Sequence, residues 1–201
     1  MIAILLGLLV GLRHAFEPDH LTAISTLVGE THDAKRGALL GAIWGLGHTV
    51  SLVVVGSILL AVGATLPEHV AAAFECCVAA MLVLLGVRAI MRRHDPVHPH
   101  VHVGARTVRP LVVGLVHGLA GSGALTAIVF AQLPTMAERI AYIALFGVGS
   151  IGGMAIASGL AGATLQVVVK GPRVRTGLSV VTGVVSIVVG IVWAIPMVAL
   201  L

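Results

Sequence analysis

The chain has 201 residues, of which 58% are hydrophobic and only 10% are charged, and its mean hydropathy is +1.10. Soluble domains carry about 25% charged residues, so the composition excludes an ordinary soluble protein and predicts a polytopic membrane protein. The net charge of +4 does not indicate nucleic-acid binding, because the Lys and Arg residues lie in short segments between apolar runs.

Apolar segments long enough to span a bilayer, which takes about 20 residues, recur along the whole chain. The first shows no basic region and no small-residue cleavage site, so we interpret it as a retained helix and not as a signal peptide. The sequence predicts an all-α membrane protein, a single bundle over residues 1–201 with six transmembrane helices. These segments are about Ile2–Val28, Ala38–Gly63, Val70–Met91, Pro110–Leu133, Ile140–Val168 and Gly177–Leu200.

Ionisable side chains crowd into the middle of the first segment: Arg13, His14, Glu17, Asp19 and His20. Each charged group at that depth costs about 2.5–3.5 kcal/mol on insertion scales. Pro18 lacks the N–H that would bond the carbonyl of residue 14, so we expect a discontinuous first helix, with that carbonyl left free. Two imidazoles and two carboxylates predict a metal site of His14, Asp19 and His20, which Glu17 completes or gates. The alternative is an internal salt-bridge network in which Arg13 neutralises a carboxylate.

Two further histidines lie inside later segments. His48 falls near the middle of the second segment and can complete the site from a neighbouring helix, although a histidine hydrogen-bonded between helices is the alternative. No carboxylate follows His117 in the sequence, so the sequence leaves open whether this histidine binds metal. Imidazole and carboxylate ligands suit nickel, cobalt or zinc, and the lack of a thiolate set argues against copper(I).

The connection at 92–109 is rich in metal-capable side chains: His94, His98, His100 and His102. Such a segment either collects metal as an accessory site or is a solvated linker, and the sequence favours neither. The adjacent Cys76 and Cys77 give no disulfide framework and are more typical of small core residues than of a redox or metal site.

Positive charge is distributed unevenly over the connections. Nearly all Lys and Arg of the loops fall on one side of the predicted bundle, which also carries the His-rich loop, and Arg139 falls on the other. By the positive-inside rule, we expect the His-rich loop to be cytoplasmic, both termini to lie outside, and the protein to reside in the cell (inner) membrane.

The two halves of the chain resemble each other at an offset of roughly 103 residues. Because each half has an odd number of predicted spans, the match predicts a 3+3 inverted repeat, with repeat 1 at about 1–91 and repeat 2 at about 110–201. Chance similarity between Gly- and Val-rich helices is the alternative. The matched pairs are Gly11–His14 with Gly114–His117, Leu21–Ile24 with Leu125–Ile128, and Trp44–His48 with Phe146–Ser150.

Two motifs in the first quarter of the chain resemble the nickel/cobalt transporter (NiCoT) family and its urease-accessory-like membrane branch. The first is Arg-His-Ala-x-x-x-Asp-His, here from Arg13 to His20, and the second is Leu-Gly-His-Ser/Thr, here from Leu46 to Thr49. The resemblance implies transport of Ni²⁺ or Co²⁺ that depends on His14, Asp19, His20 and His48. Glu17–Pro18 and the absence of a later acidic motif fit the urease-accessory-like branch better.

We therefore expect a carrier of divalent transition-metal ions, Ni²⁺ first and Co²⁺ second, and neither an enzyme nor a protein with a prosthetic group. Its expected partners are the metal ion and the lipid bilayer. One alternative is a membrane thiol-redox relay that uses the cysteines. The other is a non-transporting accessory or sensor protein that passes metal to a cytoplasmic metallochaperone through the His-rich loop.

Overall fold

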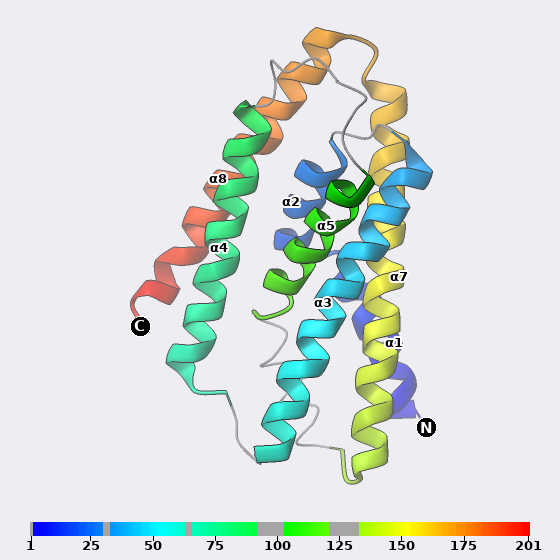
Figure 1. Ribbon diagram of the computed structural model, residues 1–201, viewed down its shortest axis with the longest axis vertical. Coiled ribbons are helices and arrows are strands. Elements are labelled where there is room, and N and C mark those ends of the chain that lie inside the picture. Colours follow the sequence, from blue (N-terminus) through cyan, green and yellow to red (C-terminus); the bar gives the residue numbers. More distant parts are fainter. Residues whose placement is uncertain (1, 30–32, 63–65, 92–102, 121–132) are drawn as a thin grey trace.

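The computed structural model describes residues 2–29, 33–62, 66–91, 103–120 and 133–201, and all regular elements in these ranges are helices. The all-α prediction is confirmed. In chain order (Figure 1) they are α1 (Ile2–His14), α2 (Pro18–Val28), α3 (Ala34–Val62), α4 (Glu68–Met91), α5 (Val103–His117), α7 (Met136–Val168) and α8 (Pro172–Val198).

Four of these helices, α3, α4, α7 and α8, are long and apolar enough to cross a membrane by length and composition. Their outer faces carry large apolar side chains that water would not solvate favourably. On α8 the exposed set includes Val181, Val184, Val185, Val188, Ile191, Val192 and Ile195. Such lengths and surfaces are typical of a protein embedded in lipid.

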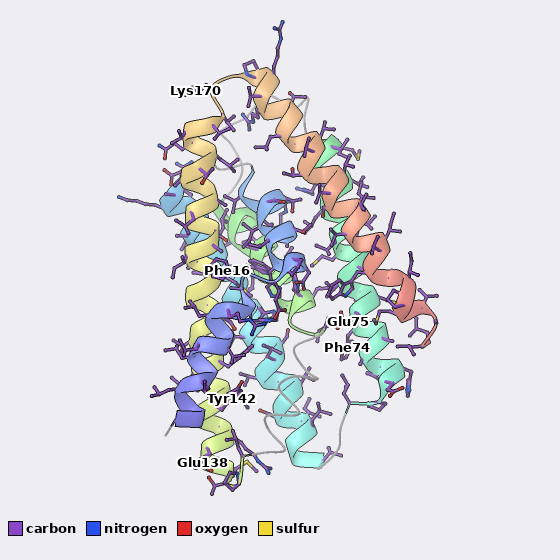
Figure 2. The ribbon with its side chains drawn as sticks, turned by 180° about the vertical axis from the view of Figure 1, so that it is seen from behind. Phe16, Phe74, Glu75, Glu138, Tyr142 and Lys170 are labelled. Atoms are coloured by element: carbon purple, nitrogen blue, oxygen red, sulfur yellow. The ribbon has the colours of Figure 1, made fainter. Side chains whose placement is uncertain are left out.

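The segment predicted at Ile2–Val28 contains two helices, α1 and α2, separated by a short turn. The predicted discontinuity of the first helix is therefore confirmed. In Figure 2, Phe16 in this turn lies roughly midway between Lys170 at one end of the molecule and Glu138 at the other. The break is thus placed near the middle of the bundle, away from both ends.

The helix in the fourth segment differs in its bounds from the apolar segment of the sequence. Helix α5 begins at Val103, inside the predicted loop 92–109, because hydropathy marks where a helix becomes apolar and not where it starts. The same helix ends at His117, so Pro110–Leu133 is not one continuous span; residues 121–132 lie outside the described part. α1 and α5 are thus short helices that each end at a histidine.

Helix α1 packs on α7 through glycines. A Cβ atom on Gly11 would lie 2.1 Å from the carbonyl oxygen of Phe146, and one on Gly149 would lie 2.2 Å from that of Leu8. No side chain fits at these two positions, so the backbones of the two helices approach as closely as in small-residue membrane interfaces.

Helix α5 packs on α3 in the same manner. A Cβ on Gly114 would lie 2.0 Å from the carbonyl oxygen of Trp44, and one on Gly47 would lie 2.3 Å from that of Leu111. Each short helix therefore contacts a long helix from the other half of the chain, through a reciprocal pair of glycines.

The directions of the helices follow from these pairings and from Figure 1. Helices α1, α4 and α7 run one way, and α3, α5 and α8 run the other way. The long pairs α3·α7 and α4·α8 are antiparallel, and α2 is enclosed between them, with contacts to all four long helices. As a result, α1 and α5 enter the bundle from opposite ends.

Candidate metal centre

The turn between α1 and α2 sets the positions of the first site residues. The Phe16 N–H donates to the Arg13 carbonyl at 2.9 Å and the Glu17 N–H donates to the His14 carbonyl at 3.0 Å. Pro18 then starts α2 at its first position, where a missing N–H is tolerated. The expectation of a free His14 carbonyl is therefore wrong, because the tight turn supplies Glu17 as a replacement donor.

Four imidazoles meet where this turn faces the neighbouring helices: His14 ends α1, His20 lies in the first turn of α2, His48 lies at the middle of α3 and His117 ends α5. All four are buried. The ring centre of His20 lies 4.1 Å from that of His117, 4.4 Å from that of His14 and 5.2 Å from that of His48. His20 is therefore the centre of the cluster.

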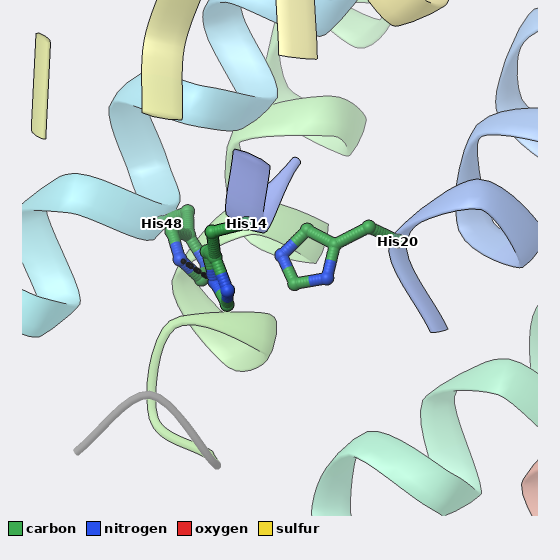
Figure 3. Close-up of side chains that lie close together, drawn as sticks. All are labelled: His14, His20 and His48. Carbon is green, nitrogen blue, oxygen red and sulfur yellow. Dashed lines mark hydrogen bonds between the residues drawn. The ribbon is translucent and has the colours of Figure 1, made fainter. Parts of the chain in front are cut away.

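Two of the imidazoles face each other through the same nitrogen. The Nε2 atoms of His14 and His48 are 3.1 Å apart, as the dashed line in Figure 3 marks. In a pair of neutral rings one nitrogen donates its hydrogen and the other accepts. Two ring nitrogens that converge in this way are also placed to offer lone pairs to one cation.

The carboxylate of Asp19 joins the cluster on the other side of His20. Its Oδ1 lies 3.1 Å from Nδ1 of His20, and its Oδ2 lies 2.8 Å from Nε2 of His117. Bending at Pro18 thus brings Asp19 to the histidines, which a straight helix would not do. The pairing also gives the buried carboxylate two donors, which lowers the free-energy cost of its burial.

Within the described residues, two sets of side chains can each hold a metal ion. One is His14, His20 and His48, the other is Asp19, His20 and His117, and in each set the ligand atoms lie within 4.8 Å of one another. Several ring nitrogens, among them Nε2 of His20, have no hydrogen-bond partner in the described part of the chain. Imidazole nitrogens with unused lone pairs or hydrogens, deep in an apolar bundle, are typical of a ligand site.

Glu17 and Arg13 lie at the rim of the cluster. Oε2 of Glu17 is 2.9 Å from Nδ1 of His14, and the Glu17 side chain is 43% exposed. Arg13 is exposed, and no ion pair among the described residues joins it to Glu17 or Asp19. The salt-bridge network that was the alternative to a metal site therefore lacks its predicted cation.

Two aromatic side chains, those of Trp44 and Phe146, lie beside the imidazoles of the cluster. The ring centre of Trp44 lies 5.4 Å from that of His20 and 5.6 Å from that of His117, and the ring of Phe146 lies 5.5 Å from that of His14. Sequence reasoning did not assign these two residues to the site. Their matched positions in the two halves of the chain, Trp44 with Phe146, were the signal that could have found them.

The two cysteines are not part of the cluster, and the His-rich loop is not described. His94, His98, His100 and His102 lie outside the described residues. Cys76 is half-buried and Cys77 exposed, both as free thiols on α4. Beside them, Nε1 of Trp193 donates to Glu75 at 2.8 Å, and Glu75 lies on the α4 side of the bundle in Figure 2.

Comparison with known proteins identifies relatives over nearly the whole chain. A urease accessory protein, UreH, from Bacillus sp. (strain TB-90) is 31% identical over 199 residues, which cover 92% of this chain and 87% of UreH. A chloroplast protein of Arabidopsis thaliana, named for growth and fertility, is 25% identical over 208 residues, and the match spans 56% of its length. No family model and no solved structure matches. The identity to UreH and the coverage of both chains show that this protein belongs to the UreH family of urease accessory proteins.

Proposed function

We propose that the protein carries divalent transition-metal ions across a membrane, with Ni²⁺ as the preferred ion and Co²⁺ second. The observation that carries this proposal is the burial of four imidazoles and one carboxylate at the break between α1 and α2. Ionisable groups inside membrane proteins are expensive and usually mark an ion path. A cation bound among these side chains would offset that cost.

The donor set favours nickel, cobalt or zinc over other ions. Imidazole nitrogens suit these metals, whereas Mg²⁺ and Ca²⁺ prefer sites made of oxygen ligands. Copper(I) prefers thiolate or thioether ligands, and the described cluster contains neither. UreH is named as an accessory protein of urease, a nickel enzyme, which supports nickel as the first choice.

The C-terminal ends of two helices also favour a cation at the cluster. α1 ends at His14 and α5 ends at His117, so the carbonyl ends of two helices meet at the cluster from opposite ends of the bundle. Each such end carries roughly half a negative charge. Broken helices whose ends face a bound ion near mid-depth are a recurrent feature of secondary transporters.

The directions of the helices support an inverted repeat of three spans in each half, at about 1–91 and 110–201. α1 corresponds to α5, α3 to α7 and α4 to α8, and the members of each pair run in opposite directions. The reciprocal glycine contacts of α1 with α7 and of α5 with α3 are the second support. In such a fold the ion site is expected where the halves meet. The proposal also includes a relation to the NiCoT family. It further places the His-rich loop in the cytoplasm and both termini outside.

An accessory role without transport is a second candidate, because the name of UreH describes an accessory protein. In that case the His-rich loop, predicted at 92–109, would pass metal to a cytoplasmic metallochaperone. Deleting 93–102 distinguishes the two candidates. A carrier keeps most of its metal flux without this segment, whereas an accessory donor loses its function.

Uptake of radioactive nickel by cells that express the protein tests the proposal. His20→Ala should abolish uptake, because His20 is the central imidazole. His69→Ala is the matched control, since His69 is exposed at the start of α4 and outside the cluster; this variant should transport normally. Full uptake by His20→Ala, at an expression level equal to that of the control, would refute the assignment.

A further inference from the structure

The side chains of the cluster form two groups and not one shell. His14 and His48 form one set of possible ligands with His20, and Asp19 and His117 form the other. Three donors that bind one ion at about 2.0–2.2 Å are at most about 4 Å apart, close to the spacing within each group. Ring centres show a smaller difference: that of His48 lies 5.1 Å from that of His14 in its own group and 6.0 Å from that of His117 in the other.

His20 belongs to both groups through its two ring nitrogens. Its Nδ1 lies 3.1 Å from Oδ1 of Asp19. Its Nε2 has no partner among the described residues, and in Figure 3 this edge of the ring faces His14. A neutral imidazole ligates a metal through either nitrogen, depending on where its hydrogen is placed. The ring can therefore serve an ion on either side without leaving its position.

We propose that the cluster holds the ion at two successive positions that share His20. The first position is formed by His14, His20 and His48, and the second by Asp19, His20 and His117. The first position includes the last residue of α1 and the second includes the last residue of α5, and these two helices enter from opposite ends of the bundle. In the transfer step of the carrier, the ion passes from one position to the other across the ring of His20. This inference rests on the proposed function and adds a mechanism to it.

The two positions differ in charge, and therefore in how tightly they hold the ion. The second contains the carboxylate of Asp19, which is buried with its two imidazole partners. The first is built of neutral imidazoles, with Glu17 available at its rim through His14. A divalent cation is attracted more strongly to a site with a negative charge, so the second position holds the ion more tightly. The first is then the loading or release position, next to the exposed Glu17.

Purified full-length protein in detergent, titrated with nickel chloride and assayed for uptake in vesicles, tests the inference. His14→Ala removes a ligand from the first position alone, and His117→Ala removes one from the second alone. We expect each single variant to keep nickel binding and to lose uptake, and the double variant to lose both. His117→Ala should show the larger loss of affinity. His69→Ala is again the control.

The experiment separates a failure of the two-position inference from a failure of the proposed function. If either single substitution abolishes nickel binding as completely as the double one, the donors form one site, and the two-position inference is overturned while the carrier assignment stands. If the double variant or His20→Ala still binds and transports nickel, the cluster is not the ion site. If the unaltered protein neither binds nor transports nickel, the proposed function itself fails. His48→Ala addresses the first position from α3 and replaces His14→Ala if that variant does not elute as a monodisperse protein.

Discussion

The close packing of α1 on α7 predicts that a single methyl group will disturb the metal centre. In Gly149→Ala the new Cβ would lie 2.2 Å from the carbonyl oxygen of Leu8 and 3.0 Å from the backbone nitrogen of Leu12. Ordinary contact begins at 3.4 Å, so α1 must move away from α7 by about 1 Å. That movement is transmitted to His14, the last residue of α1.

The size of the effect follows from the geometry of metal ligation. Metal–ligand distances tolerate deviations of about 0.2 Å, so a shift of about 1 Å removes His14 from its position. Measured in the His117→Ala background, which leaves only the position of His14, His20 and His48, nickel affinity should fall by about tenfold or more, equivalent to ~1.4 kcal/mol. Overpacking of this kind also destabilises a protein by about 1–3 kcal/mol.

Gly152→Ala provides a matched control on the same helix. A Cβ on Gly152 meets nothing within 4 Å, so this variant should bind nickel normally. Its thermal stability should equal or slightly exceed that of the parent, because Ala is favoured over Gly in helices by about 1 kcal/mol. Nickel titration and thermal unfolding in detergent measure both quantities. Equal affinities and equal melting temperatures for Gly149→Ala and Gly152→Ala would refute the reasoning.

Three further outcomes are expected. In the His117→Ala background, where only the first position remains, Glu17→Gln should weaken nickel binding by about 10–100-fold without abolishing it, because its carboxylate orients His14. An unchanged affinity in that background would contradict this role. Nickel binding should weaken once the pH is low enough to protonate the ligating imidazoles, because a ligating imidazole must be neutral. An affinity that stays constant over the whole acidic range in which the protein remains folded would be evidence against imidazole ligands. Ser186→Ala should lower the free energy of unfolding by about 0.6 kcal/mol and leave nickel affinity intact, because the Ser186 hydroxyl donates to the Leu82 carbonyl between α8 and α4. Thermal unfolding measures the change in stability. A loss of nickel binding would contradict the separation of this pair from the site.

Much of the architecture was accessible from sequence because a membrane imposes simple length and polarity rules. Hydropathy predicted the long helices to within a few residues, and Pro18 predicted the break before α2. The first site residues followed from the same argument, since ionisable groups in an apolar segment need a partner. Pro18 also explained how Asp19 reaches the histidines.

The arrangement within the cluster could not be predicted in the same way. Which histidines face each other depends on the crossing of α3 and α5, which the glycine pair Gly47 and Gly114 sets in three dimensions. His117 was left open because no carboxylate follows it in the sequence; in the structure its carboxylate partner is Asp19 of the other half, 2.8 Å away. The start of α5 was missed because a charged helical turn and a loop have the same hydropathy.

Anomalous scattering at the nickel absorption edge, from the nickel-loaded protein, is the most direct test of the central claim. The account predicts a nickel peak within bonding distance of a ring nitrogen of His20, with the remaining ligands drawn from His14 and His48 or from Asp19 and His117. A peak confined to other parts of the chain, with the four imidazoles bonded only to one another and to Asp19, would contradict it.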